Sequence, residues 1–220
     1  MTRIHTVLFD LDGTLLDTAQ DLAHALNQLR QQYHLPPLPL ATIRPHVGYG
    51  AKAMLKVGMD VTEEHPQYTT LLDEFLNFYR VCLTQTTKLF DGIDNVLTQL
   101  ENKNIPWGIV TNKPSRFTFD LLKALKLDHR AACIICGDSL SRRKPDPDQI
   151  LHACELLKQS PENCLYIGDT QTDALASRAA GTKTLIVLYG YLQEHEDPFA
   201  WGADGYAKVP ADIIAWLDQK

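Results

Sequence analysis

The chain of 220 residues lacks a long apolar run, an excess of basic residues and any regular spacing of cysteines. Its longest apolar candidate, Thr184 to Leu192, falls well short of the roughly 18 residues that cross a membrane. Lys and Arg number 21 against 27 Asp and Glu, which gives a net charge of −6. Nucleic acids and anionic membranes bind basic faces, so this balance argues against both as partners. An anionic ligand would have to be attracted locally, through a metal, a lysine or backbone amides.

The five cysteines are an odd number, which fits reduced thiols rather than a disulfide framework. Cys133 and Cys136 form a C-x-x-C, but the apolar run around them (AACIIC) favours packing in the core over a metal or redox site. A strand is expected from Val7 onward, which leaves no room for a signal peptide before it. We therefore expect a cytoplasmic protein without a membrane partner.

The stretch VLFDLDGT, residues 7–14, predicts a buried strand that ends in two acids. Side chains two places apart in a strand share a face, about 6.5 Å apart, so Asp10 and Asp12 are expected to project together. Gly13 then lets the chain turn sharply with its amides bare. Two carboxylates in a nearly dry crevice repel each other unless a cation lies between them or one keeps its proton. Such a pair does not stabilise the fold, which indicates a functional site.

A long helical stretch is expected after this strand. An apolar stripe from Leu22 to Tyr33 predicts a helix, with Thr18 and Asp21 placed as its capping box. Residues 17–87 carry no strand signal and therefore form an all-helical insertion. From Lys88 onward, helices and strands alternate, which predicts a parallel sheet with helices on both faces. The fold class is α/β, and the core is expected to consist of residues 1–16 and 88–220.

The strands predicted in this core end next to polar residues. They are expected at Trp107 to Thr111, Ala132 to Cys136, Cys164 to Ile167 and Thr184 to Leu188. In such sheets, ligands bind beyond the carboxyl ends of the strands. The polar residues at or just after these ends are Asp10, Asp12, Thr111, Lys144, Asp169 and Asp173. Each has an ordinary alternative as a helix cap or a surface charge, but together they indicate one site.

Three of these acids suit a magnesium ion. Asp10, Asp12 and Asp169 offer hard oxygen ligands, which Mg²⁺ prefers and zinc does not. A metal would cancel the repulsion between the carboxylates and let one of them approach an anionic phosphate. One aspartate can then attack phosphorus and form an aspartyl phosphate. The other, if protonated, can donate to the leaving oxygen and later take a proton from water.

The remaining polar groups suit the phosphate itself. Phosphoryl transfer needs mainly positioning and the neutralisation of charge on the phosphoryl oxygens. Lys144 supplies a positive charge, and the Thr111 hydroxyl and the backbone amides near Gly13 and Asn112 supply donors. The sequence therefore predicts a site for a small phosphorylated metabolite.

The motif series DLDGT, TNK, KPDP and GDTQTD resembles that of the haloacid dehalogenase-like hydrolases. The resemblance covers nearly the whole chain, and the four motifs occur in the family's order. It implies that Asp10 is the nucleophile and Asp12 the general acid and base. It also implies that Thr111 and Lys144 bind the phosphoryl group.

The same resemblance implies a metal site and a cap. Mg²⁺ would be held by the Asp10 side chain, the Asp12 carbonyl oxygen and Asp169, with Asp173 supporting the metal site from close by. The family's fold is a Rossmann-like sheet with a mobile cap that closes over the core and selects the substrate. By this likeness, the insertion at residues 17–87 is the cap.

Within the family, the chain is similar to phosphoglycolate phosphatases through LFDLDGTLLDT, VTNKP and VGYGAKAML. The runs KLFDGIDNVL, WGIVTNKPSRF and WGAD also resemble N-acetylmuramic acid 6-phosphate phosphatases. We expect hydrolysis of 2-phosphoglycolate, with the sugar phosphate as the alternative. Recognition of a small acid would use a cationic or amide-rich cap loop, for which Arg44, Gly48 and Gly50 are the candidates. Gly13 and Asn112 would bind the substrate from the core.

Three other classes share part of this pattern. A phosphoacceptor signalling domain also places acids, a threonine and a lysine at strand ends, but needs only about half this length and no cap. A dehalogenase would use Asp10 without a metal, which would leave Asp12, Asp169 and Asp173 redundant. A phosphomutase shares every motif and differs only in where the phosphoryl group goes next.

Overall fold

The computed structural model describes residues 4–219 and places six parallel strands in one sheet, in the order β5-β4-β1-β6-β7-β8. Their bounds are Thr6–Phe9 (β1), Trp107–Val110 (β4), Ile134–Ile135 (β5), Cys164–Gly168 (β6), Lys183–Val187 (β7) and Gly205–Ala207 (β8). β1 lies inside the sheet, where Val7 pairs with Trp107 on one side and Leu165 on the other. The strand order runs outward from β1 in both directions, and ligands bind at such a reversal.

Helices cover both faces of the sheet, which confirms the expected architecture. They are α5 (Ile93–Asn102), α6 (Ser115–Ala124), α7 (Asp148–Leu156), α8 (Gln171–Ala180) and α9 (Ala211–Leu217). Side chains alternate along β1, so Val7 and Phe9 join the apolar cluster that contains residues of α5, α6 and α9. Leu8 points the other way and packs with residues of α7 and α8. Burial on both faces explains why Val7, Leu8 and Phe9 are all apolar.

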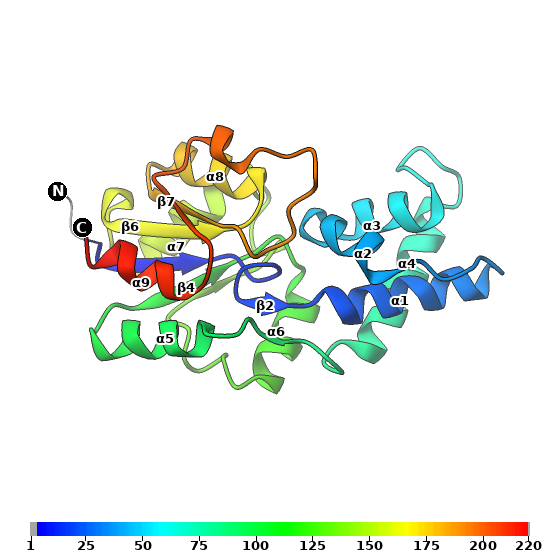
Figure 1. Cartoon of the computed structure of the whole chain (residues 1–220), viewed down its shortest axis with the longest axis horizontal. Helices are drawn as coiled ribbons and strands as arrows, with labels where there is room; N and C mark the ends of the chain where they lie inside the picture. Colours follow the sequence, from blue (N-terminus) through cyan, green and yellow to red (C-terminus); the bar gives the residue numbers. More distant parts are fainter. Residues whose placement is uncertain (1–3, 220) are drawn as a thin grey trace.

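The insertion is helical and lies at one end of the molecule, beyond the tips of the core strands (Figure 1). Its elements are α1 (Ala19–Gln32), α2 (Leu40–Ile43), the 3₁₀ helix η1 (Arg44–Tyr49), α3 (Gly50–Met59) and α4 (Tyr68–Cys82). Two short antiparallel strands, β2 (Leu16–Asp17) and β3 (Lys88–Leu89), join it to the core. The expected limits of the insertion fall on this ribbon, and we propose residues 17–87 as a separate cap domain.

The start of α1 differs from the expected capping box. Thr18 makes no side-chain cap bond, and the buried carboxylate of Asp21 accepts hydrogen bonds from Thr86 and Thr87 instead. The amide and the hydroxyl of each threonine donate, at distances from 2.6 to 3.1 Å. A buried carboxylate favours several charge-assisted bonds over one bond at a helix end. Asp21 thereby joins the first helix of the insertion to the segment that leaves it.

Neither β8 nor α9 was expected. β8 was missed because a strand of three residues gives too short an apolar pattern to recognise. β8 nevertheless extends the sheet beside β7, and α9 packs against α5. None of the helices within residues 4–219 is long and apolar enough to cross a membrane.

The contacts of Asp21 predict its contribution to stability. Asp21→Asn places an amide nitrogen where the carboxylate accepts from N–H and O–H groups, so buried donors lose their acceptor. We expect the free energy of unfolding to fall by about 2–3 kcal/mol in urea titrations. The exposed Asp120 on α6 is the matched control, and Asp120→Asn should stay within about 0.5 kcal/mol of the parent chain. Equal effects of the two substitutions would contradict the assigned role of Asp21.

Candidate active site

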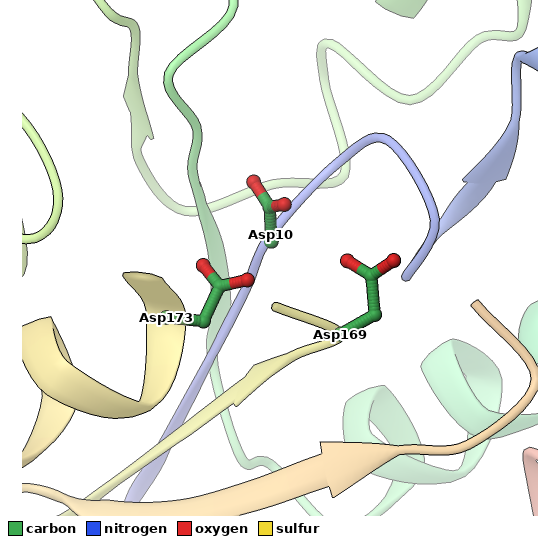
Figure 2. A group of neighbouring side chains, drawn as sticks. All are labelled: Asp10, Asp169 and Asp173. Atoms are coloured by element: carbon green, nitrogen blue, oxygen red, sulfur yellow. The ribbon is translucent and has the colours of Figure 1, made fainter. Parts of the chain in front are cut away.

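Three carboxylates meet at the carboxyl edge of the sheet (Figure 2). Asp10 follows β1, Asp169 follows β6, and Asp173 lies in the first turn of α8. One oxygen of each lies within 4.8 Å of those of the other two, and all three side chains are buried. Residues separated by more than 150 positions are thus brought together by the parallel topology, at the edge where ligands of such sheets bind.

Lys144 reaches this cluster from the loop between β5 and α7 and is itself buried. Its Nζ donates to Asp10 Oδ1 at 2.8 Å, to Asp173 Oδ1 at 2.7 Å and to the Tyr166 hydroxyl at 2.7 Å. Burial lowers the pKa of Lys144, but the two carboxylates outweigh it and the net shift is upward. Burial raises the pKa of Asp173, but Lys144 outweighs it and the net shift is downward. Lys144 and Asp173 therefore form a charged pair beside Asp10.

The other two carboxyl groups shift in the opposite direction. Burial raises the pKa of Asp10 to about 7, against the lowering effect of Lys144 and with further raising by Asp173 and Asp12. Burial also raises the pKa of Asp169 well above its usual range, and the charges of Asp173 and Asp10 add to this. One lysine does not balance three carboxylates, so the ionised cluster favours an additional proton or cation.

Asp169 is held by close approaches of the backbone. Tyr191 N donates to Asp169 Oδ2 at 2.8 Å. Gly13 has a φ of 86°, and a Cβ at this position would lie 2.1 Å from the same oxygen. A Cβ at Gly190 would lie 2.4 Å from it. The Gly13 amide donates to Leu16 O at 2.9 Å, so it is not the bare donor that was expected. The glycine is required by its conformation and by the nearness of Asp169.

The side chain of Asp12 has partners of its own. Its oxygens accept from Lys113 Nζ at 3.0 and 3.1 Å and from Thr18 Oγ1 at 2.7 Å. β1 ends at Phe9, so strand alternation does not set the direction of Asp10 and Asp12. Asp10 faces Lys144 and Asp12 faces Lys113. The expectation that the Asp12 carboxylate joins the cluster with Asp169 is therefore not met, while its carbonyl oxygen stays a predicted ligand.

Thr111 and Asn112 follow β4, as expected, and line the cavity above the cluster. The buried Thr111 hydroxyl accepts from Lys113 N at 3.1 Å, which leaves its own proton to donate to a ligand. Asn112 Nδ2 donates to Lys144 O at 2.9 Å. The Asn112 side chain therefore positions the lysine loop.

The cavity has a volume of about 800 Å³ and lies between the core and the insertion. Asp10, Thr111 and Lys144 line it from the core, and Gly48 and Gly50 line it from the insertion. One apolar wall of the cavity comes from α4 and contains Leu72, Phe75, Leu76 and Tyr79. Cavities of this size that combine apolar walls with a few polar groups are typical of sites for small molecules.

Arg44 is not among the residues that line this cavity. Its Nη1 donates to both oxygens of Asp17, at 2.8 and 3.0 Å, and its guanidinium carbon lies 4.8 Å from the centre of the Tyr191 ring. Tyr191 Oη in turn accepts from Thr18 N at 2.7 Å. Arg44 thus lies at the junction between core and insertion, and its charge is compensated by Asp17.

Three residues of the site were not anticipated. Lys113 is the lysine of the TNK motif, but only the folded chain shows that it reaches Asp12. Tyr166 lies inside β6, where its buried hydroxyl contacts Lys144 and Asp173. A tyrosine within an apolar strand, three residues before an acid, was the only available signal. The role of Tyr191 depends on its backbone amide, which has no sequence signature.

The fold and site define a Rossmann-like core with a helical insertion and a carboxylate cluster at the edge of its sheet. The chain belongs to the haloacid dehalogenase-like hydrolase family, whose model matches residues 7–187. The resemblance seen in the four motifs is thereby confirmed.

Individual relatives extend this similarity over the full chain. The chain is 38% identical over 217 residues to an N-acetylmuramic acid 6-phosphate phosphatase from Pseudomonas aeruginosa, covering 99% of this chain and 96% of that protein. It is 39% identical over 213 residues to a phosphoglycolate phosphatase from Xanthomonas campestris pv. campestris, covering 96% of each. The crystal structure of a predicted phosphoglycolate phosphatase from Haemophilus somnus is 26% identical and superimposes with a TM-score of 0.87. It covers 98% of this chain and 99% of that one.

The raised pKa of Asp10 predicts a pH dependence for the metal-free protein. The folded-state pKa of about 7 exceeds the usual 3.8, so the folded state binds a proton more tightly than the unfolded state. This contribution to stability is fully present below the unfolded pKa and is lost as the pH rises through about 7. The amide side chain in the variant Asp10→Asn does not titrate, so the variant lacks this loss of stability. Between about pH 5 and pH 8, the free energy of unfolding of the variant should therefore rise by about 1–3 kcal/mol relative to that of the parent chain, measured by denaturation with chelator present. A difference that does not change with pH would contradict the assignment.

Proposed function

We propose that the chain is a Mg²⁺-dependent phosphatase that hydrolyses a small phosphorylated acid through an aspartyl phosphate on Asp10. The observation that carries this proposal is the position of Asp10, which lines the cavity while its carboxylate contacts Lys144 at 2.8 Å. Lys144 Nζ balances charge beside the attacking oxygen, and the Thr111 proton is available to a phosphoryl oxygen. These are the parts that phosphoryl transfer requires.

The reaction then proceeds in two steps on this chain's own groups. An oxygen of Asp10 forms a bond to phosphorus, the bond to the ester oxygen breaks, and Asp12 gives its proton to the leaving oxygen. Asp12 next takes a proton from water, whose oxygen attacks phosphorus and releases Asp10 and inorganic phosphate. The contacts of Asp12 with Lys113 and Thr18 hold its carboxylate in place for this second step.

The donor set of the carboxylate cluster fits Mg²⁺. Among residues 4–219, no donor reaches Asp10 Oδ2, and Asp169 Oδ1 accepts only a long bond of 3.4 Å from Thr14 Oγ1. Both oxygens of Asp173, by contrast, accept from Lys144 and Thr170. Asp10, Asp169 and the Asp12 carbonyl oxygen would therefore hold the ion, and Asp173 would orient Lys144 and α8. When bound, Mg²⁺ would supply positive charge to the phosphoryl oxygens.

The two substrates named for the relatives share a phosphate ester and a carboxylate. 2-Phosphoglycolate is the first candidate from the motifs, and phosphoglycolate phosphatases align over 96% of the chain. The cavity of about 800 Å³ exceeds what a two-carbon acid fills, and it supports N-acetylmuramic acid 6-phosphate as the second candidate. The apolar wall of α4 suits the face of a sugar ring better than a short acid.

The rival classes fit the site less well. A phosphoacceptor domain has no use for a large cavity over its aspartate, whereas a phosphatase needs room for its substrate. A dehalogenase without metal would gain nothing from Asp169 and Asp173 beside Asp10. A phosphomutase shares the site, and its product would be an isomeric phosphate ester instead of inorganic phosphate.

The proposal is tested by release of inorganic phosphate from the two candidates, measured side by side with Mg²⁺. We expect turnover of at least one of them, lost on chelation. Asp10→Asn should lower kcat at least about 10³-fold, because an amide is a poor nucleophile. Circular dichroism of this variant controls for folding. Turnover that survives chelation would contradict the requirement for Mg²⁺. Turnover that survives the Asp10 substitution would contradict the route through Asp10.

A further inference from the structure

Five of the described residues that line the cavity have cationic side chains. They are Lys52, Lys113, Arg142, Arg143 and Lys144. Four of them have carboxylate partners, because Lys52 pairs with Glu63, Lys113 with Asp12, Arg142 with Asp148, and Lys144 with Asp10 and Asp173. Within residues 4–219, the guanidinium of Arg143 has no hydrogen bond, ion pair or ring contact. Arg143 is therefore the one of these five cations whose charge has no partner within the described part of the chain.

The neighbouring Arg142, unlike Arg143, has carboxylate partners. Its Nη2 and Nε donate to Asp148 Oδ1 at 2.7 and 3.1 Å, and its Nη1 lies 4.0 Å from Asp146 Oδ1. Both arginines are exposed and line the same cavity, but only Arg142 has its charge compensated within the chain. Arg142 is therefore the matched control for Arg143.

Arg143 is also well placed relative to the phosphate site. It directly precedes Lys144, whose Nζ contacts Asp10. Tyr68, the first residue of α4 in the insertion, lines the same cavity. Burial and Glu63 raise the pKa of Tyr68, and Lys52 and Arg143 act against this rise. A ligand with its phosphate on Asp10 and Lys144 would thus extend between Arg143 and α4.

We propose that Arg143 binds the carboxylate of the substrate and so selects phosphorylated acids over other phosphate esters. A guanidinium offers two parallel N–H donors that match the two oxygens of a carboxylate. Both candidate substrates carry such a group, at different distances from the phosphate. The inference rests on the proposed function, since it names the chemical class that the same site accepts. In this role Arg143 takes the place of Arg44, which was expected to bind the small acid but is paired with Asp17.

The test compares Arg143→Ala, Arg143→Lys and the control Arg142→Ala in their preference for carboxylated substrates. The substrate pairs are 2-phosphoglycolate against ethyl phosphate and N-acetylmuramic acid 6-phosphate against N-acetylglucosamine 6-phosphate. For the pair that contains the true substrate, Arg143→Ala should lower the ratio of the two kcat/KM values about 10- to 100-fold, mainly through KM. Arg143→Lys should retain part of the preference, since it keeps the charge but not the paired donors. Arg142→Ala should leave the ratio unchanged.

A binding measurement separates this inference from the proposed activity. Titration calorimetry with phosphonoacetate and with ethylphosphonate, in the presence of Mg²⁺, needs no turnover. We expect the carboxylated phosphonate to bind more tightly, and Arg143→Ala to remove most of that difference. If this holds while no ester is hydrolysed, the proposed function fails and the role of Arg143 stands. A parent chain without preference for the carboxylated ligand, or an equal loss in Arg142→Ala, would overturn the inference.

Discussion

The structure depends on the burial of three carboxylates around a single lysine. Lys144 Nζ lies 2.7–2.8 Å from oxygens of Asp10 and Asp173, and the charges of these two carboxylates add to the effect of burial in raising the pKa of Asp169. When all four groups are ionised, the cluster keeps an excess of negative charge in a poorly solvated place. Such an arrangement is unfavourable for stability alone, and it becomes favourable when a divalent cation or a phosphoryl group with its metal is bound.

The same cluster is connected to the junction between the core and the insertion. The amide of Tyr191 donates to Asp169, and its hydroxyl accepts from Thr18 N and Ala19 N at the start of α1. Arg44 lies over the ring of Tyr191 and joins η1 to Asp17 in β2. One residue thus contacts both the candidate metal ligand and the first helix of the insertion. Tyr191 therefore fixes the position of Asp169 relative to the start of the insertion.

Much of the fold and part of the site could be predicted, and the reasons differ between residues. Asp10, Thr111 and Asp169 directly follow apolar runs, and parallel topology brings the ends of such runs together whatever the side-chain details. Lys144 lies in the loop that follows another of these strands. The partners of a side chain depend instead on packing between distant segments. Asp12 faces Lys113, Asp21 binds Thr86 and Thr87, and Arg44 pairs with Asp17, and no spacing in the sequence reports these contacts. The difference between Arg142 and Arg143 is likewise visible only in three dimensions.

We propose that the excess negative charge of the cluster forms a site for one magnesium ion. Calorimetric titration of Mg²⁺ into the metal-free chain measures the number of ions bound and their affinity, and Asp169→Asn is the matched isosteric variant. We expect one Mg²⁺ to bind per chain, with an affinity at least about tenfold weaker in Asp169→Asn. Absence of binding to the parent chain, or equal affinities of the two proteins, would contradict it.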